Sequence, residues 1–237
     1  MDRESLLNRL KAKPDLNLFV AEVIRDAAIL PILFEIVLTE KSGIKYTCSK
    51  IIRMVSEQKP ELVYPYFENV ALWLRIPNSF IKWDGILALS NLAAVDREDK
   101  FGAIYEDYFG LIRDSRMITA SNVIGNAWKI VFARPEWESD ITARLLEVPG
   151  IMYMYKGEPS PECNRIVCGH VLACFGHYFD RSGSQGAMIR FAQGQLGNSR
   201  KAVAKNAEKF LKSHSIRQTN KILFNHSKPS NDQGEPS

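Results

Sequence analysis

Three cysteines and two histidines lie close together in one stretch of the chain, at Cys163, Cys168, His170, Cys174 and His177. Thiolate and imidazole groups are the usual ligands of zinc. On an α-helix, four of these side chains (all but Cys168) would project within about 60° of one another, because each residue turns the helix by ~100°. The competing interpretation is that the cysteines pack in the core as small apolar residues. Because the short loop-borne ligand spacing of zinc sites is absent, we expect no metal and no cofactor.

Four lysines form a second group near the C-terminal end, at Lys201, Lys205, Lys209 and Lys212. Their spacing of i, i+4, i+8 and i+11 places them on one stripe of a helix. Such a stripe suits a polar face that closes the end of a repeat protein. It also suits an acidic partner or the phosphates of nucleic acid. Both interpretations remain open from the sequence.

Catalytic motifs are absent from the sequence. There is no Gly-x-Ser-x-Gly elbow, and no glycine-rich phosphate loop follows a strand pattern. The acidic loop at residues 96–100 lacks the spacing and the glycine of a calcium loop, which favours a solvated turn. We therefore expect a protein that is not an enzyme.

The positive charge is concentrated at one end of the chain. The formal net charge is +4 over 237 residues. Residues 199–228 contain eight basic residues and one acid, so this segment is strongly basic and the remainder is slightly acidic. The first residues lack the pattern of a signal peptide, and no apolar run is long enough to span a bilayer. With four cysteines in helical patterns, these features predict a cytoplasmic protein with no membrane partner.

A helical phrase recurs at a spacing of about 37 residues. Each copy has a basic residue, a small residue three positions later and apolar residues at the seventh and eleventh positions. The basic residues are Lys45, Lys82, Arg165 and Lys201, and a further copy begins at Thr119. A period of this length is typical of a solenoid of stacked helical units. Because a cation is unfavourable in the first turn of its own helix, each basic residue should contact an acid or carbonyl of the next unit, or else a partner.

The hydrophobic pattern predicts helices throughout and no extended strands. Two or three N-terminal helices should cap about five helical pairs, with residues 1–213 forming one all-α superhelical domain. We expect residues 214–237 to form a basic, then polar, disordered tail. The expected helices cover residues 4–11, 17–25, 29–39, 45–56, 64–75, 81–94, 101–113, 118–133, 139–148, 164–179, 187–196 and 200–213.

The segments 81–93 and 199–211 resemble repeats of the HEAT family of armadillo-like solenoids, and the similarity extends over about residues 28–213. The chain is also similar to uncharacterised prokaryotic HEAT proteins. The copy at Thr119 departs from the pattern, with Lys129 at an apolar position. The resemblance implies a binding surface along a concave face formed by the second helix of each pair. Some DNA glycosylases share this fold and use tryptophan with a carboxylate, a combination that occurs here at Trp83 and Asp84.

Residues 150–161 interrupt the period and contain Met152, Tyr153, Met154 and Tyr155. An insertion in a solenoid often lies on the binding face, and tyrosine and methionine are frequent at interfaces. The alternative is that these side chains seal the widened gap between two units. The sequence does not distinguish the two.

These observations predict a scaffold that binds another protein, with nucleic-acid binding through the lysine stripe as the alternative and a glycosylase-like enzyme as a distant third. The residues expected to contact a partner are Lys45, Lys82, Trp83, Tyr153, Tyr155, Arg165, Lys201, Lys205, Lys209 and Lys212.

Overall fold

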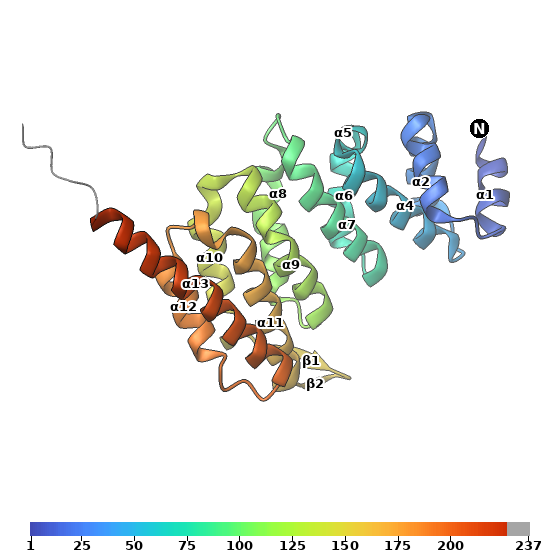
Figure 1. The fold of residues 1–237 in the computed structure, drawn as a ribbon. Helices are drawn as coiled ribbons and strands as arrows, with labels where there is room; N and C mark the ends of the chain where they lie inside the picture. The colour runs from blue at the N-terminus through green and yellow to red at the C-terminus, as the bar shows by residue number, and fades with distance from the viewer. Residues whose placement is uncertain (227–237) are drawn as a thin grey trace, which may run out of the picture.

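The chain folds as a row of stacked helical pairs (Figure 1). The computed structural model describes residues 1–226, and the side chains of residues 1–214. One layer consists of the long helices, each of which packs against the next: α4 (Ile44–Gln58), α7 (Ser79–Leu92), α9 (Met117–Ala133), α11 (Pro161–Tyr178) and α13 (Lys201–His226). The second layer holds the shorter helices α5 (Pro60–Val63), α6 (Phe67–Leu72), α8 (Lys100–Gly110), α10 (Glu138–Leu146) and α12 (Gln185–Gly194).

The N-terminal helices cover the first long helix, as expected. They are α1 (Arg3–Lys11), α2 (Leu16–Arg25) and α3 (Leu30–Thr39), and all three contact α4. Asp15 caps α2 by accepting hydrogen bonds from two backbone N–H groups. None of the helices in the described part of the chain is both long enough and apolar enough to cross a membrane.

Short 3₁₀ turns join many of the helices and account for several of the misplaced helix ends. The expected helix at residues 64–75 is interrupted, because Pro65 lies in such a turn before α6. The 3₁₀ turns are η1 (Ala27–Ile29), η2 (Tyr64–Tyr66), η3 (Trp73–Arg75), η4 (Ala93–Val95), η5 (Leu111–Arg113), η6 (Pro135–Trp137), η7 (Val148–Gly150) and η8 (Phe179–Arg181).

The small residue three positions after the basic one allows close packing, as Gly85 demonstrates. A Cβ atom added there would lie 2.9 Å from Cβ of Trp73, which is fully buried in the next layer. The equivalent Cys48 and Cys168 are also buried. Small side chains at this position therefore let each long helix approach its second-layer partner.

A small hairpin forms within the insertion, where the sequence analysis expected no strands. Strands β1 (Met154–Tyr155) and β2 (Glu158–Pro159) pair antiparallel. The turn between them is formed by Lys156 and Gly157, both with positive φ angles. Two residues per strand are too few for a period-2 pattern to be visible in the sequence.

The last helix extends beyond its expected end. The sequence pattern predicts an end at residue 213, but α13 continues to His226. No proline or glycine occurs between residues 214 and 226, so nothing in the local sequence breaks the helix. The rest of the expected disordered tail, residues 227–237, lies outside the residues that the structure describes.

Candidate partner-binding surface

Hydrogen bonds between adjacent long helices hold the outer surface of their layer in register. Asp84 of α7 accepts from Ser49 Oγ at 2.7 Å and from Arg53 Nε at 3.1 Å, both on α4. Asn91, also on α7, donates to Ser56 Oγ at 3.0 Å and accepts from Lys129 Nζ of α9 at 2.7 Å. These bonds join neighbouring units at a separation of about one repeat and so preorganise the surface.

The pair Trp83 and Asp84 is part of this linkage between units. Trp83 Nε1 donates to Thr119 Oγ1 on α9 at 3.1 Å. Burial raises the pKa of Asp84, while the hydrogen bonds from Ser49 and Arg53 and the charge of Arg53 act in the opposite direction. Both side chains therefore have a structural role that explains their types, and the glycosylase hypothesis gains no support from them.

Aromatic rings gather at the starts of α4 and α7. The Phe80 ring lies 5.6 Å from Tyr46 and 5.4 Å from Trp83 between centroids, and Phe80 is 60% exposed. Asn78 Nδ2 donates to the Tyr46 hydroxyl and fixes the edge of the group. Exposed aromatic side chains on rigid helices are typical energetic anchors of protein interfaces.

A second aromatic group lies toward the C-terminal ends of α9 and α11. Trp128 stacks on His177 with a centroid separation of 4.4 Å, and Phe132 packs edge-on against Trp128. The guanidinium of Arg181 lies 4.9 Å from the Phe132 ring centre. Together with Asn91 and Lys129, Trp128 and Phe132 line a cavity of about 410 Å³. Burial lowers the pKa of the Lys129 ammonium in this wall.

The basic residues of the helical phrase have different environments. Lys82 Nζ lies 3.9 Å from Asp114 of the following unit, which is the kind of contact expected for all of them. Arg165 instead pairs with Glu162 one turn earlier at 3.5 Å, and Lys45 Nζ lies 5.3 Å from the Tyr46 ring centre. Lys201 is exposed. The contact with the next unit is therefore found at one copy of the four.

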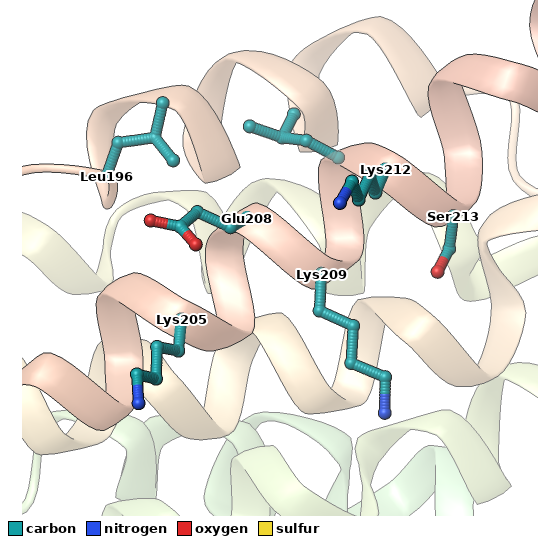
Figure 2. A pocket seen from close by; sticks show the side chains of 7 residues that line it. Leu196, Lys205, Glu208, Lys209, Lys212 and Ser213 are labelled. Carbon is teal, nitrogen blue, oxygen red and sulfur yellow. The ribbon is translucent and has the colours of Figure 1, made fainter.

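The lysine stripe forms the edge of the last unit. Lys201, Lys205, Lys209 and Lys212 are all exposed, and none makes an ion pair within the described residues. In Figure 2, Lys205 and Lys209 extend toward one side of α13 and Glu208 toward the other. An open hollow of about 720 Å³ lies against this helix and is lined also by Leu196 and Leu211.

The insertion divides its two tyrosines between core and surface. Tyr153 is fully buried and its hydroxyl donates to the carbonyl of Ile112 at 2.9 Å. It was predicted to contact a partner, and that prediction is wrong because the ring fills the gap between two units. Tyr155 is 59% exposed at the hairpin and stays a candidate contact.

The cysteine and histidine group is likewise divided between the core and the surface. All of its cysteines are buried free thiols, whereas His170 and His177 are exposed. Burial raises the pKa of Cys174 to about 12, which disfavours the thiolate that would bind a metal. Within the described residues no group of three or more metal-binding side chains is close enough to hold an ion.

Charge differs between the two layers. The five long helices, taken to residue 214, carry ten lysine and arginine residues against four acidic residues. The second-layer α-helices carry three basic against six acidic residues. Many second-layer charges pair with one another, as Arg144 does with Glu106 and Asp140 at 2.6 Å. The long-helix layer is therefore the side that attracts anions.

Two polar residues of this surface, Asn91 and Asn206, were missed by the sequence analysis. The sequence does mark the neighbouring Lys129 as unusual, because a lysine stands there at a position where the repeat pattern expects an apolar residue. Asn91 and Asn206 carry no such mark, since an asparagine on a helix is usually a solvated surface residue.

Comparison with known proteins identifies the fold. A designed armadillo repeat protein, YIII(Dq)4CqI, superposes with a TM-score of 0.53, covering 81% of this chain and 84% of the designed one at 13% sequence identity. The chain has an armadillo-like helical repeat fold. No family model and no curated protein matches the sequence. The likeness confirms the all-α solenoid expected from the repeated phrase.

Proposed function

We propose that this protein is a non-catalytic scaffold that binds another protein across its long-helix layer. The observation that supports the proposal is the combination of exposed aromatic groups around Phe80 and Phe132 with an excess of cations on one layer. The proposal places this activity in the cytoplasm, because the buried free cysteines suit a reducing compartment.

The mechanism rests on a surface that is already rigid before the partner arrives. The bonds of Asp84 and Asn91 fix the spacing of α4, α7 and α9. Little conformational entropy is then lost on association, so a modest number of aromatic contacts is enough for specific binding. Phe80 and Phe132 are the anchors that we expect to contribute most.

Capture from a native lysate with quantitative mass spectrometry tests this proposal. The double variant Phe80→Ala, Phe132→Ala should lose the proteins that the wild type retains. Leu72→Ala is the matched control, because Leu72 is 56% exposed but lies on second-layer helix α6. If the control loses the same proteins, or if the double variant retains them all, the long-helix layer is not the binding surface.

The lysine stripe favours nucleic acid as a second candidate partner. Its four ammonium groups have no acidic partner in the described residues, and clustered lysines bind phosphates in a salt-dependent way. Replacing all four by glutamate should leave the fold intact and abolish retention on single-stranded nucleic acid at low salt. Absence of retention by the wild type would remove this candidate.

A further inference from the structure

A groove runs between α11 and α13 on the long-helix layer. Two hollows of about 640 and 300 Å³ lie along it and share Ala173 and Asn206 in their linings. Gly169, Ala173 and Gly176 line the α11 side. Val203 of α13 fills the space at Gly169, where an added Cβ would lie 3.0 Å from its Cγ2 atom, whereas a Cβ at Gly176 would meet nothing within 4 Å. The groove is therefore open at Ala173 and Gly176, where a polypeptide backbone can approach α11 closely.

Cations line the α13 side of this groove. Lys201 lines one hollow and Lys209 the other, and neither makes an ion pair within the described residues. Arg200 also lines it and pairs with Glu162 at 3.0 Å. The other oxygen of Glu162 lies 3.5 Å from Arg165, so one carboxylate balances two guanidinium groups. The lining therefore carries an excess of positive charge and suits an anionic occupant.

Asn206 adds a polar contact at the middle of the groove. Its side chain is exposed, and no hydrogen bond engages its amide within the described residues. A primary amide offers both a donor and an acceptor. The C=O and N–H groups of an extended peptide present the complementary pair.

We propose that this groove binds a short, extended acidic segment of a partner protein, with its backbone at Asn206 and its carboxylates on Lys201 and Lys209. The inference deepens the proposed scaffold function by naming the chemistry of the partner. From Lys201 to Lys209 α13 rises by about 12 Å. That length accommodates about four residues of extended chain.

The lining of the groove favours a peptide over nucleic acid. Proteins that hold single strands supply aromatic faces on which bases stack. The phenyl ring in this lining is that of Phe210, which is 6% exposed and packs on Phe179 at 5.4 Å. The imidazole of His214 is also buried, and that of His170 is exposed. Within the described residues the groove thus offers cations, an amide and one exposed imidazole, but no row of aromatic faces on which successive bases could stack.

Fluorescence anisotropy with three labelled probes tests the inference. The first probe is a peptide of about eight residues alternating glutamate and glycine, the second has glutamine in place of glutamate, and the third is a single-stranded oligonucleotide of equal charge. The wild type should bind the glutamate peptide, more tightly at low salt, and bind the other two at least about tenfold more weakly.

Two variants locate the binding. The double variant Lys201→Gln, Lys209→Gln should bind the glutamate peptide with an affinity lower by about tenfold or more. Gly176→Leu should block the groove without a backbone clash, because a Cβ at Gly176 would meet nothing within 4 Å. The matched control, Lys41→Gln with Lys50→Gln, makes the same charge change at exposed lysines outside the groove and should alter affinity by less than about twofold. Thermal unfolding confirms that each variant is folded.

Several outcomes would overturn the inference: no binding of the glutamate peptide, equal binding of the glutamine peptide, equal loss in the control, or tighter binding of the oligonucleotide with the same dependence on Lys201 and Lys209. The scaffold function is tested by a different pair of residues, Phe80 and Phe132. If the acidic peptide fails to bind while Phe80→Ala, Phe132→Ala still loses its partners, the groove assignment falls and the scaffold function stands.

Discussion

Asp96 is a single carboxylate that joins three elements of the fold. Its side chain is fully buried and accepts hydrogen bonds from the Tyr64 hydroxyl at 2.7 Å and from the backbone N–H groups of Lys100 and Phe101 at 2.9 Å. Arg134 of the next unit lies 3.3 Å away. The sequence analysis placed this loop in solvent, which holds for the exposed Glu98 and Asp99 but is wrong for Asp96. Its carboxylate caps α8 although Asp96 lies four residues before the first residue of the helix. Capping rules apply to the residue directly before a helix, so they do not reveal this contact from the sequence.

We expect Asp96→Asn to lower the free energy of unfolding by about 2–3 kcal/mol at neutral pH, because an amide supplies fewer acceptors to these buried donors. Burial acts to raise the pKa of Asp96, but the hydrogen bonds from Tyr64, Phe101, Lys100 and Arg134 outweigh it and lower the pKa. The stabilisation is therefore present above the unfolded-state value of about 3.9 and is lost as the pH falls through the lower folded-state value.

Urea titrations at neutral pH and below pH ~4 would measure this difference. The difference in the free energy of unfolding between wild type and Asp96→Asn should be smaller at the lower pH. Asp99→Asn serves as the control, because Asp99 is 66% exposed although it also pairs with Arg134. A control effect as large as that of Asp96→Asn would contradict the assignment of the stabilising role to Asp96.

Gly85 gives a second prediction at the scale of single residues. Gly85→Ala should lower the free energy of unfolding by about 1–3 kcal/mol, because the new Cβ would overlap Trp73 Cβ at 2.9 Å and the helices would have to separate. A Cβ at Gly125, a glycine inside the long helix α9 at another position of the phrase, would meet nothing within 4 Å, so Gly125→Ala should stabilise by up to about 1 kcal/mol. If the melting temperatures of both variants shift in the same direction, the close contact between α7 and Trp73 at Gly85 is refuted.

At the scale of elements, the hairpin insertion acts mainly as a seal. Met154 N–H donates to the carbonyl of Ser115 at 2.8 Å, and Asn164 Nδ2 donates to the carbonyls of Val148 and Ile151 at 2.7 Å. These bonds tie the insertion to the units on either side. The ring of Tyr153 then fills the extra space that the longer spacing creates.

Tyr153→Ala should therefore destabilise the protein by about 3–5 kcal/mol, as expected for loss of a fully buried aromatic ring. Tyr155→Ala should change stability by less than about 0.5 kcal/mol, because that ring is largely in solvent. Chemical denaturation of the two variants provides the comparison. Equal stability of both variants would mean that the insertion does not seal the gap.

The elements also show what the sequence could and could not predict. The phrase starting at Lys45, Lys82, Arg165 and Lys201 located the long helices, because a helix that must pack on two neighbours repeats its apolar face. The continuation of α13 and the 3₁₀ turns were missed, since tertiary packing decides where a helix ends. On the surface, the stripe of lysines was visible as a helical spacing. The groove beside it was not, because it requires α11 and α13 to be adjacent, and that is a fact of topology.

At the scale of the whole molecule, the bonds between units make a chain of nearest-neighbour couplings. Ser49, Arg53 and Asp84 join α4 to α7, Asn91 joins α7 to both sides, and Thr142 joins α10 to Tyr178 of α11 at 2.9 Å. In a one-dimensional stack, stability is the sum of unit and interface terms. Damage at an interior interface should consequently spread to both neighbours, while damage at the end stays local.

Asn91→Ala is the substitution that tests this coupling, because it removes the bonds to Ser56 and to Lys129 at once. Native-state hydrogen exchange should show lower protection in α4, α7 and α9, a smaller loss in α11, and little change in α1. The matched end variant is Arg9→Gln, which breaks the paired contacts of Arg9 with Glu22 at 2.7 Å and should affect α1 and α2 only. Uniform loss of protection across all described helices after Asn91→Ala would indicate one globally cooperative unit. A graded loss that declines with distance from α7 is the outcome that the stacked architecture requires, because each unit is stabilised only by the two that it touches.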